Sequence, residues 1–267
     1  MTVIAVFGLG EAGSRIATDL AAAGAEVRGY DPAAVPTPAG VHRTEQPDDA
    51  VVDADLVLAI TAAADAAGAL EQAIGAIGIG SIYADLSTAP AVLKQSLAAT
   101  AEGAHLQFVD VALMAIVPGR GALTPSLASG SGAAAYGTAF AALGFDSVEV
   151  ISAEAGDAAT RKLLRSIFMK GFAAVIIEAM TAAEAAGQRD WLWGNLVDEI
   201  SAAGAPMLSR LVRGTGPHAV RRLHEMEASA ALITGLGIDP IMTDATVASL
   251  HRVIRDGLPD IPVVPDE

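Results

Sequence analysis

The sequence predicts an α/β fold in which a doubly wound parallel sheet precedes an all-helical second domain. Up to Ile151, short apolar runs rich in β-branched residues alternate with helical segments of about a dozen residues, which is typical of a parallel sheet with crossover helices. Beyond Gly156 no strand pattern occurs, while helical periodicity continues. We therefore expect a first domain at residues 1–153 and a second at residues 154–267.

The individual elements follow from apolar periodicity and from glycine and proline at their ends. Strands are expected at Thr2–Phe7, Glu26–Tyr30, near Val41, Asp55–Ile60, Ser81–Asp85, His105–Val111, Leu123–Ser129 and Ser147–Ile151. In the first domain, helices are expected before Gly24, at Asp65–Ile77 and at Ser131–Leu143. In the second they are expected from Gly156 to Gly187, at Asp190–Ala203, Ala205–Val212, Pro217–Leu236 and Pro240–Ile254, followed by an extended tail, Leu258–Glu267, with three prolines.

Composition excludes several classes of protein. With 31 acidic and 16 basic residues the formal charge is -15, which argues against a nucleic-acid partner because phosphates reward basic surfaces. The chain has no cysteine, hence no disulfide and no thiolate metal site, and we expect no metal because no histidines or carboxylates have ligand spacing. No apolar run approaches the roughly 20 residues of a membrane span. We expect a soluble, cytoplasmic protein without a membrane partner.

A glycine-rich segment, Gly8-Leu9-Gly10-Glu11-Ala12-Gly13, joins the first strand to the first helix. Gly8 would allow the tight turn, Gly10 would let a pyrophosphate approach the backbone, and Gly13 would let helix and strand pack closely. The N–H groups of the helix N-terminus would then face the phosphates. In this strand–turn–helix context the segment predicts a Rossmann domain that binds NAD(P) through residues 8–13.

The end of the second strand bears on the choice of coenzyme. Asp31 can accept hydrogen bonds from the adenosine ribose hydroxyls and would repel a 2′-phosphate, which favours NAD over NADP. It could instead be a turn aspartate ahead of Pro32, and Arg28 and Arg43 keep NADP open. Thr61, in the turn after the strand at residues 55–60, should lie at the same cofactor edge of the sheet.

A second polar segment, Asp85-Leu86-Ser87-Thr88-Ala89-Pro90, ends the strand at residues 81–85. Ser87 or Thr88 could be the N-cap of a helix with proline in its first turn. Since ligands bind parallel sheets at the carboxyl ends of their strands, Ser87 and Thr88 are also candidates for contacts to the cofactor, and Ser87 for contacts to a substrate.

Lysine is scarce, and two of the three lysines fall in one helical segment. Of the sixteen Lys and Arg residues only Lys94, Lys162 and Lys170 are lysines. Arginine keeps its proton in proteins whereas a buried lysine titrates, so lysine is the residue that acid/base chemistry needs. Lys162 is therefore a candidate general acid/base, and ordinary surface charge is the alternative explanation.

The three segments, at Gly8–Gly13, Asp85–Pro90 and Gly156–Ser166, stand in the order and spacing of the β-hydroxyacid dehydrogenases, which include 3-hydroxyisobutyrate and 6-phosphogluconate dehydrogenases. The sequence resembles this superfamily over essentially its whole length. The resemblance implies a Rossmann domain, a helical domain of 6-phosphogluconate dehydrogenase type, and a homodimer formed through the latter. It also implies that Lys162 is the catalytic lysine, because Gly156 precedes it by six residues as the family glycine does.

This chain departs from the family pattern at two places. Ser166 replaces the asparagine that follows the catalytic lysine by four residues. The substrate-binding segment is reduced to Asp110–Ile116, which puts 3-hydroxyisobutyrate and tartronate semialdehyde in doubt and leaves Ala112 and Met114 as the substrate-binding candidates.

The expected reaction is hydride transfer between nicotinamide and a small hydroxy acid or its oxo form. Lys162 would move the hydroxyl proton, and Ser166, one helical turn on, could reach the same oxygen. Arg165 and Lys170 suggest that the substrate carries a carboxylate. Two alternatives remain open, an imine reductase of the same fold and a nicotinamide-binding sensor without catalysis.

Overall fold

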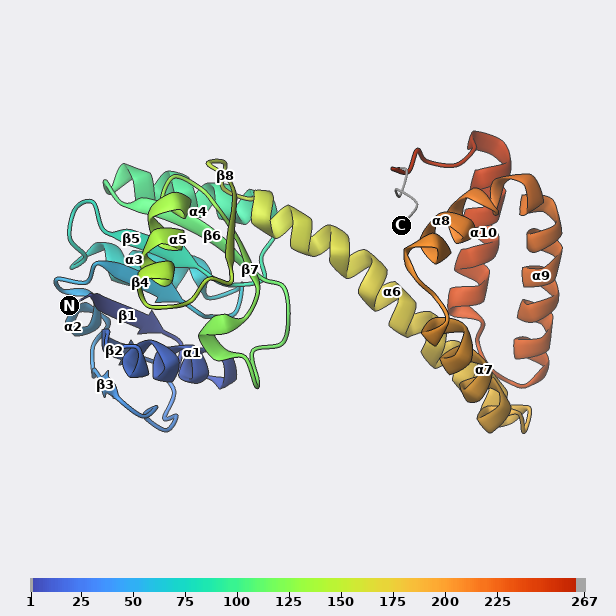
Figure 1. Cartoon of the computed structure of the whole chain (residues 1–267), viewed down its shortest axis with the longest axis horizontal. Helices are drawn as coiled ribbons and strands as arrows, with labels where there is room; N and C mark the ends of the chain where they lie inside the picture. Colours follow the sequence, from blue (N-terminus) through green and yellow to red (C-terminus); the bar gives the residue numbers. More distant parts are fainter. Residues whose placement is uncertain (1, 263–267) are drawn as a thin grey trace. The chain divides into compact units, whose positions relative to one another are not determined.

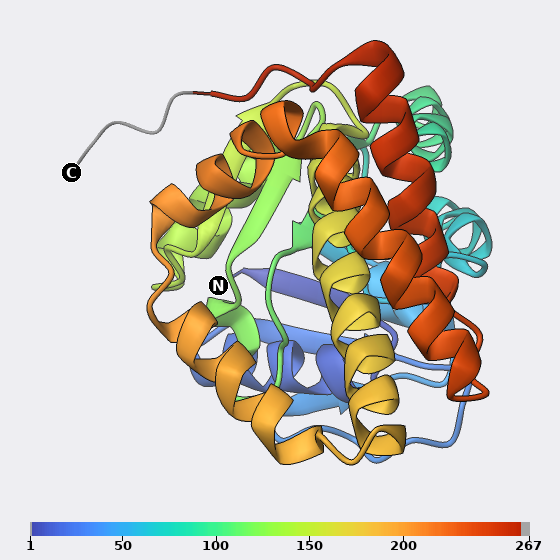
Figure 2. The ribbon, with the colours of Figure 1, turned by 90° about the vertical axis from the view of Figure 1, so that its right-hand side faces the viewer.

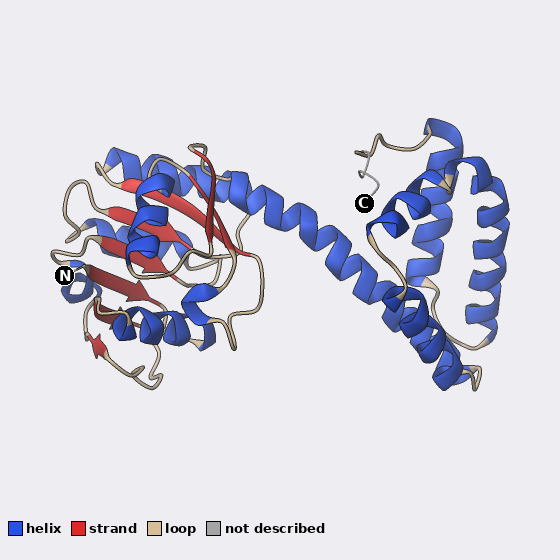
Figure 3. Cartoon of the chain, in the orientation of Figure 1, coloured by secondary structure: helices blue, strands red, loops and turns tan. Residues whose placement is uncertain are grey.

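The computed structural model describes residues 2–262, and the chain divides into two compact units between Arg165 and Ser166 (Figure 1). The division falls inside one long helix, α6 (Asp157–Ala185). The first unit contains the sheet with its helices, and the described part of the second is helical (Figure 3).

Within the described residues the sheet has eight strands in the order β3-β2-β1-β4-β5-β6-β7-β8. The strands are β1 (Val3–Phe7), β2 (Glu26–Tyr30), β3 (Val41–Arg43), β4 (Leu56–Ala59), β5 (Ile82–Asp85), β6 (Gln107–Leu113), β7 (Ser126–Ser129) and β8 (Val148–Ser152). All pairings from β3 to β6 are parallel, β6 and β7 are antiparallel, and β7 and β8 are parallel. The predicted α/β fold is confirmed, with the last two strands reversed relative to the rest.

Helices cover both faces of the sheet because strand residues alternate between the faces. Ile4 and Val6 join one buried cluster with α1 (Glu11–Ala22) and α5 (Ala133–Ala142). Ala5 and Phe7 join the other, with α2 (Pro47–Val51), α3 (Ala66–Ile74) and α4 (Ala91–Gly103). Both faces are thus closed by apolar packing, and the strand ends are left as the place for polar chemistry.

The structure corrects three details of the expected elements. Strand β6 starts only at Gln107, because His105 has a φ of 62° in a turn, and it continues to Leu113, because β7 pairs with residues 110–113. The strand expected from Leu123 is shorter, since residues 121–123 form a 3₁₀ helix, η1. The five-residue α2 has too few residues for a recognisable period and was not predicted.

The second unit contains the rest of α6, then α7 (Arg189–Ser201), α8 (Ala205–Arg213), the 3₁₀ helix η2 (Gly216–His218), α9 (Ala219–Gly235) and α10 (Ile241–Asp256). Helices α9 and α10 pack side by side (Figure 2). These helices match the predicted segments to within a few residues at each end. Residues 263–267 of the tail that we expected to be extended lie outside the described residues.

None of the helices in the described part of the chain combines the length and the apolar character that a membrane span requires.

Glu178 of α6 ties that helix to the start of α10. Its carboxylate accepts hydrogen bonds from the N–H groups of Met242 at 2.7 Å and Thr243 at 2.8 Å, and from the Thr243 hydroxyl at 2.6 Å. The carboxylate therefore satisfies N–H groups in the first turn of α10 that have no partner within the helix. Burial opposes ionisation of Glu178, but these hydrogen bonds outweigh it and lower its pKa below the ordinary value of 4.5.

The lowered pKa predicts an acid-sensitive helical unit. A carboxylate whose folded-state pKa is depressed contributes stability above its ordinary pKa, here 4.5, and that stability is lost as pH falls through the lower folded value. Thermal unfolding of wild type and Glu178→Gln, measured between pH 3 and pH 7, should therefore differ near neutrality and converge at acid pH. Glu184→Gln, at an exposed position of the same helix, is the control. A stability difference for Glu178→Gln that does not change with pH would contradict the assignment.

Candidate functional site

The glycine turn after β1, residues 8–13, forms a concave surface, here called the cradle. The space around the Cβ position differs among its three glycines. Gly8 has a φ of 89°, and a Cβ on it would lie 2.3 Å from the Ile60 carbonyl oxygen. A Cβ on Gly13 would lie 1.9 Å from the carbonyl oxygen of Gly8, so helix α1 and strand β1 touch here. Gly10 faces open space, with nothing within 4 Å of its Cβ position. The turn therefore needs Gly8 and Gly13 to fold, while Gly10 leaves its surroundings clear for a ligand.

Helix α1 begins beside this open space. Gly10 is its N-cap residue and supplies no side-chain hydrogen bond, so the first N–H groups of the helix are available to an anion. Glu11, exposed, is the first helical residue, and Ala12 is half-buried behind it. Leu9 is buried and belongs to the apolar cluster under α1.

Asp31, directly after β2, is bonded to the glycine turn. Its carboxylate accepts the N–H of Leu9 at 2.7 Å and the N–H of Ala33 at 2.8 Å. Each carboxylate oxygen retains a further lone pair, so the group can still accept hydrogen bonds from a ribose. The contact fixes the glycine turn relative to the end of β2.

Two arginines were candidates for a 2′-phosphate, and only one lies near Asp31. The Arg28 guanidinium bonds Glu26, at the start of β2, and the Val52 carbonyl, at the opposite end of the sheet from Asp31. Arg43 donates to the carbonyls of Asp31 at 2.9 Å, Ala33 at 2.6 Å and Val35. Arg43 thus holds the loop after β2 in place.

A cleft of about 480 Å³ lies at the carboxyl ends of β1, β2 and β4. Its lining brings together four sequence-predicted residues, Gly8, Gly10, Asp31 and Thr61, with Tyr30, Pro32, Ile60, Ala62, Ala64, Asp65, Gly68, Ala69 and Gln72. The Thr61 hydroxyl is buried and has no hydrogen-bond partner among the described residues. The open Gly10 cradle, the Asp31 carboxylate and the unsatisfied Thr61 hydroxyl together fit the adenosine and pyrophosphate groups of a dinucleotide.

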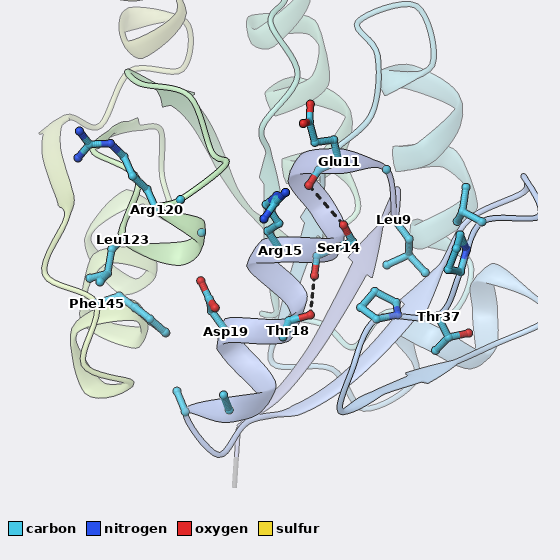
Figure 4. Close-up of a pocket in the computed structure, with 18 of the residues that line it drawn as sticks. Leu9, Glu11, Ser14, Arg15, Thr18, Asp19, Thr37, Arg120, Leu123 and Phe145 are labelled. Atoms are coloured by element: carbon cyan, nitrogen blue, oxygen red, sulfur yellow. Dashed lines mark hydrogen bonds between the residues drawn. The ribbon is translucent and has the colours of Figure 1, made fainter.

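A larger groove of about 1120 Å³ runs along the outer face of α1 (Figure 4). Helix α1 forms its floor, with Arg120, Leu123 and Phe145 on one side and Thr37 on the other. It reaches the glycine turn at Leu9, Gly10 and Glu11. Asp19 accepts the N–H of Ala122 at 2.8 Å and so fastens η1 to α1. Of the residues predicted for the site, the lining of this groove includes Leu9, Gly10 and Glu11.

At the end of β5 and beside it within β6 lies a charged cluster that was not predicted from the sequence. Lys94, on α4, is fully buried, with its ammonium 2.8 Å from Asp85 and 3.1 Å from Asp110. Burial, and secondarily the charge of Asp85, raises the pKa of Tyr83 on β5. One signal was present in the sequence, because Lys94 occupies the same helical stripe as Leu97 and Ala101 and so lies on the buried face of α4.

Ser87 belongs to this cluster and Thr88 does not. Ser87 is buried, and its hydroxyl donates a hydrogen bond to the Asp85 carboxylate at 2.8 Å, while Thr88 is exposed. The N-cap reading of Ser87 or Thr88 is wrong, because α4 begins at Ala91 with Pro90 as its N-cap residue. The proline restricts the preceding residue to an extended conformation, and this delays the helix.

The substrate candidates on β6 lie in and just beyond the ladder. Ala112 is buried and pairs with Leu127 of β7, and Met114, half-buried, donates its N–H to Pro125 at 2.8 Å. On α6, Lys162 is half-buried about one and a half turns after Asp157, and Ser166, half-buried, follows one turn later. Arg165 and Lys170 are exposed. Among the described residues no group of three His, Cys, Asp or Glu side chains is placed to hold a metal.

The comparisons with known proteins agree with this geometry. Residues 3–134 match the family model described as the NAD binding domain of 6-phosphogluconate dehydrogenase. This part of the chain is an NAD-binding domain of the 6-phosphogluconate dehydrogenase family. Residues 183–253 match a domain of unknown function, DUF1932, so the NAD-binding domain is followed by a helical region with its own family model.

The similarity to solved structures covers residues of both units. An imine reductase from Myxococcus stipitatus in complex with NADP+ has a TM-score of 0.78 at 17% identity, covering 96% of this chain and 95% of that one. A conserved protein of unknown function, reported as similar in structure to 3-hydroxyacid dehydrogenases, has a TM-score of 0.60 at 25% identity, with 94% and 96% covered. The fold is therefore shared with both kinds of protein.

An uncharacterised 28.5 kDa protein of Methanothermus fervidus is 30% identical over 99 residues, and the match covers 37% of this chain. It spans 39% of the length of that curated relative.

The crowding at the glycines predicts opposite outcomes for two alanine substitutions. Gly10→Ala should leave the thermal midpoint close to wild type but weaken NADH binding, because the added methyl occupies the open cradle. Gly13→Ala should destabilise the fold by several kcal/mol, in the range of severe overpacking. Thermal unfolding and NADH fluorescence titration measure the two effects. A Gly10→Ala protein that binds NADH as wild type does would remove the cradle from the binding site.

Proposed function

We propose that this protein is an NAD(P)-dependent oxidoreductase that transfers a hydride between nicotinamide and a small hydroxy acid or its oxo form. The observation that carries the proposal is the open cradle at Gly10. Gly10 is the N-cap residue of α1, whose N-terminus has no side-chain cap, and it lines the same cleft as Asp31 and Thr61. Such a cradle binds a pyrophosphate. Bound nicotinamide would supply the hydride donor or acceptor at its C4 atom.

In this proposal Lys162 moves the proton that accompanies the hydride. During oxidation its neutral amine takes the proton of the substrate hydroxyl as the carbinol C–H bond breaks, and during reduction its ammonium returns a proton to the carbonyl oxygen. Ser166, at the i+4 position, would bind the same oxygen. Arg165 and Lys170 would bind a substrate carboxylate.

The coenzyme preference follows from what surrounds Asp31. A carboxylate at the ribose end of the cleft disfavours a 2′-phosphate. The Arg43 guanidinium is already used by three loop carbonyls, and Arg28 lies at the other end of the sheet. We therefore favour NAD over NADP.

The second candidate function is reduction of a C=N bond. It is supported by the likeness of the whole chain to the Myxococcus stipitatus imine reductase. The lysine that the resemblance to the β-hydroxyacid dehydrogenases implies for catalysis is present as Lys162, and this favours the hydroxy-acid reaction.

Turnover of NADH and NADPH should be measured spectrophotometrically with a panel of small oxo acids and cyclic imines. We expect oxidation of NADH by an oxo acid, and a loss of about 10²- to 10⁴-fold in kcat for Lys162→Ala, as for removal of a general acid/base. Arg161→Ala, exposed on the same helix, should retain wild-type activity. Equal activity of Lys162→Ala and wild type would refute its role, and turnover of imines alone would establish the second function. Coenzyme binding without any turnover would favour a sensor.

We also propose that the protein forms a homodimer through its helical domain. α7 has no buried residue, and large apolar side chains with exposed fractions of 55–73% crowd α6, α7 and α8, among them Ile167, Trp191, Trp193 and Leu208. Apolar surface of this extent on a single chain marks an interaction face. A face repeated on each copy would be buried by two-fold pairing.

Light scattering after size exclusion tests this pairing. Wild type should have the mass of a dimer, and Ile167→Glu should shift the protein toward the monomer, because a charge would enter the apolar contact. Ile79→Glu is the matched control, since Ile79 is 84% exposed in the NAD-binding domain. A monomeric wild type, or equal dissociation of both variants, would contradict the proposal.

A further inference from the structure

The Lys94 ammonium lies among three oxygen atoms inside the protein. It forms ion pairs with Asp85 Oδ2 at 2.8 Å and Asp110 Oδ1 at 3.1 Å, and it donates a hydrogen bond to the Asp85 carbonyl oxygen at 2.9 Å. The Lys94 and Asp110 side chains are 0% exposed, and that of Asp85 is 1% exposed. A buried charge without partners is strongly unfavourable, so this arrangement depends on all three groups being present.

Asp110 connects this cluster to the start of α6. Its Oδ2 atom accepts the N–H of Ala159 at 2.9 Å and that of Gly156 at 3.2 Å. Ser129, whose hydroxyl is 3.4 Å from the same oxygen, accepts the N–H of Ala158 at 3.1 Å. These N–H groups have no acceptor within the helix, so β6 and β7 supply their acceptors.

Gly156 restricts the start of α6 further. It has a φ of 100°, and a Cβ on it would lie 3.1 Å from both the carbonyl oxygen and the Cβ of Ala91, the first residue of α4. The left-handed conformation and the close approach leave little freedom to shift the first turn of α6. Lys162 follows that turn on the same continuous helix.

Asp85 connects the cluster to Ser87. The Ser87 hydroxyl donates to Asp85 Oδ2 at 2.8 Å, and its N–H lies 3.3 Å from Oδ1. A serine hydroxyl has one proton, so Ser87 Oγ retains only acceptor capacity. It would therefore receive a hydrogen bond from the cofactor or substrate.

We propose that Lys94 is a positioning residue of the active site. By neutralising Asp85 and Asp110 together, it holds both carboxylates in place. Asp110 accepts the N–H groups at the start of α6 and so sets the position and rotation of the turn that carries Lys162, while Asp85 accepts the hydrogen bond from the Ser87 hydroxyl. One ammonium serves two carboxylates, and the positive end of the α6 dipole at Asp110 complements the remaining negative charge. This proposal rests on the proposed function of Lys162.

The test compares Lys94→Met, the double variant Lys94→Met/Asp85→Asn and the control Arg161→Met. Lys94→Met leaves two buried carboxylates without their cation, whereas the double variant removes one negative charge with the positive one and keeps Asp110 at α6. Arg161→Met removes a cation that is 55% exposed on α6. The readouts are thermal unfolding, the NADH dissociation constant, kcat, KM and its pH profile, and hydrogen exchange of the amides at residues 156–160.

Lys94→Met should lower kcat by at least about tenfold, since a misplacement of about 1 Å can cost 10²-fold, and should leave the NADH dissociation constant within about threefold of wild type. Amide exchange at residues 156–160 should accelerate and the pH profile of kcat should shift. The double variant should recover much of both the amide protection and kcat. Arg161→Met should change none of these quantities.

Three outcomes would overturn the proposal. One is a folded Lys94→Met protein with wild-type kcat and wild-type amide protection. Another is parallel loss of NADH binding and kcat in proportion to unfolded protein, which would give Lys94 a role in stability alone. The third outcome applies if Lys94→Met does not fold. In that case a double variant that folds but leaves the amides at residues 156–160 unprotected would overturn the proposal.

The amide exchange separates this proposal from the proposed function. If wild type binds NADH but turns over no substrate, the function of Lys162 fails, and accelerated exchange in Lys94→Met still establishes that Lys94 holds the start of α6. Unchanged exchange would refute the positioning role in that case also.

Discussion

One buried ammonium shared by two carboxylates joins the sheet to the helix that follows it. Lys94 reaches Asp85 at the end of β5 and Asp110 within β6, and Asp110 accepts the N–H groups that begin α6. A buried ionic cluster contributes little net stability compared with apolar packing, but removing one member leaves an uncompensated charge. Its value in this fold is geometric, because each member has partners on a different element.

The carboxyl edge of the sheet is divided between two kinds of chemistry. At β1, β2 and β4 the backbone supplies most of the polar groups, with an open glycine turn and helix N–H groups, and the cleft of about 480 Å³ also contains the carboxylates of Asp31 and Asp65. At β5 and β6 side chains supply the polar groups, and their charged and hydroxyl groups form a buried network of ion pairs and hydrogen bonds. Binding of a dinucleotide needs the first kind because phosphates bind the backbone, whereas the second kind supplies the acceptors that fix the start of α6.

The two units also differ in how they use apolar residues. In the first, both faces of the sheet are sealed by helices, and most large apolar side chains are buried. In the second, α7 buries none of its residues, and aromatic and aliphatic side chains of α6 to α8 face outward. The NAD-binding domain therefore completes its own core, while the helical unit leaves apolar surface for a further contact.

The sequence by itself determined the fold class, the glycine turn and most helices and strands. These features depend on local periodicity and on glycines within a few residues of each other, which a linear pattern records. The short α2 and the reversed strands β7 and β8 escaped it, since five residues show no period and strand direction is set by pairing across the sheet.

Tertiary structure alone decided which of the three lysines is fully buried. Lysine scarcity directed attention to Lys162 and Lys170, and the third lysine, Lys94, proved to be the buried one. Its partners lie nine and sixteen positions away on two strands, a separation that no local pattern reports. Likewise Ser87 proved to be a partner of Asp85 and not a helix cap, because Pro90 delays α4. Local sequence patterns therefore predict the helices and strands, whereas the packing of residues distant in the sequence decides which charged and hydroxyl groups contact one another.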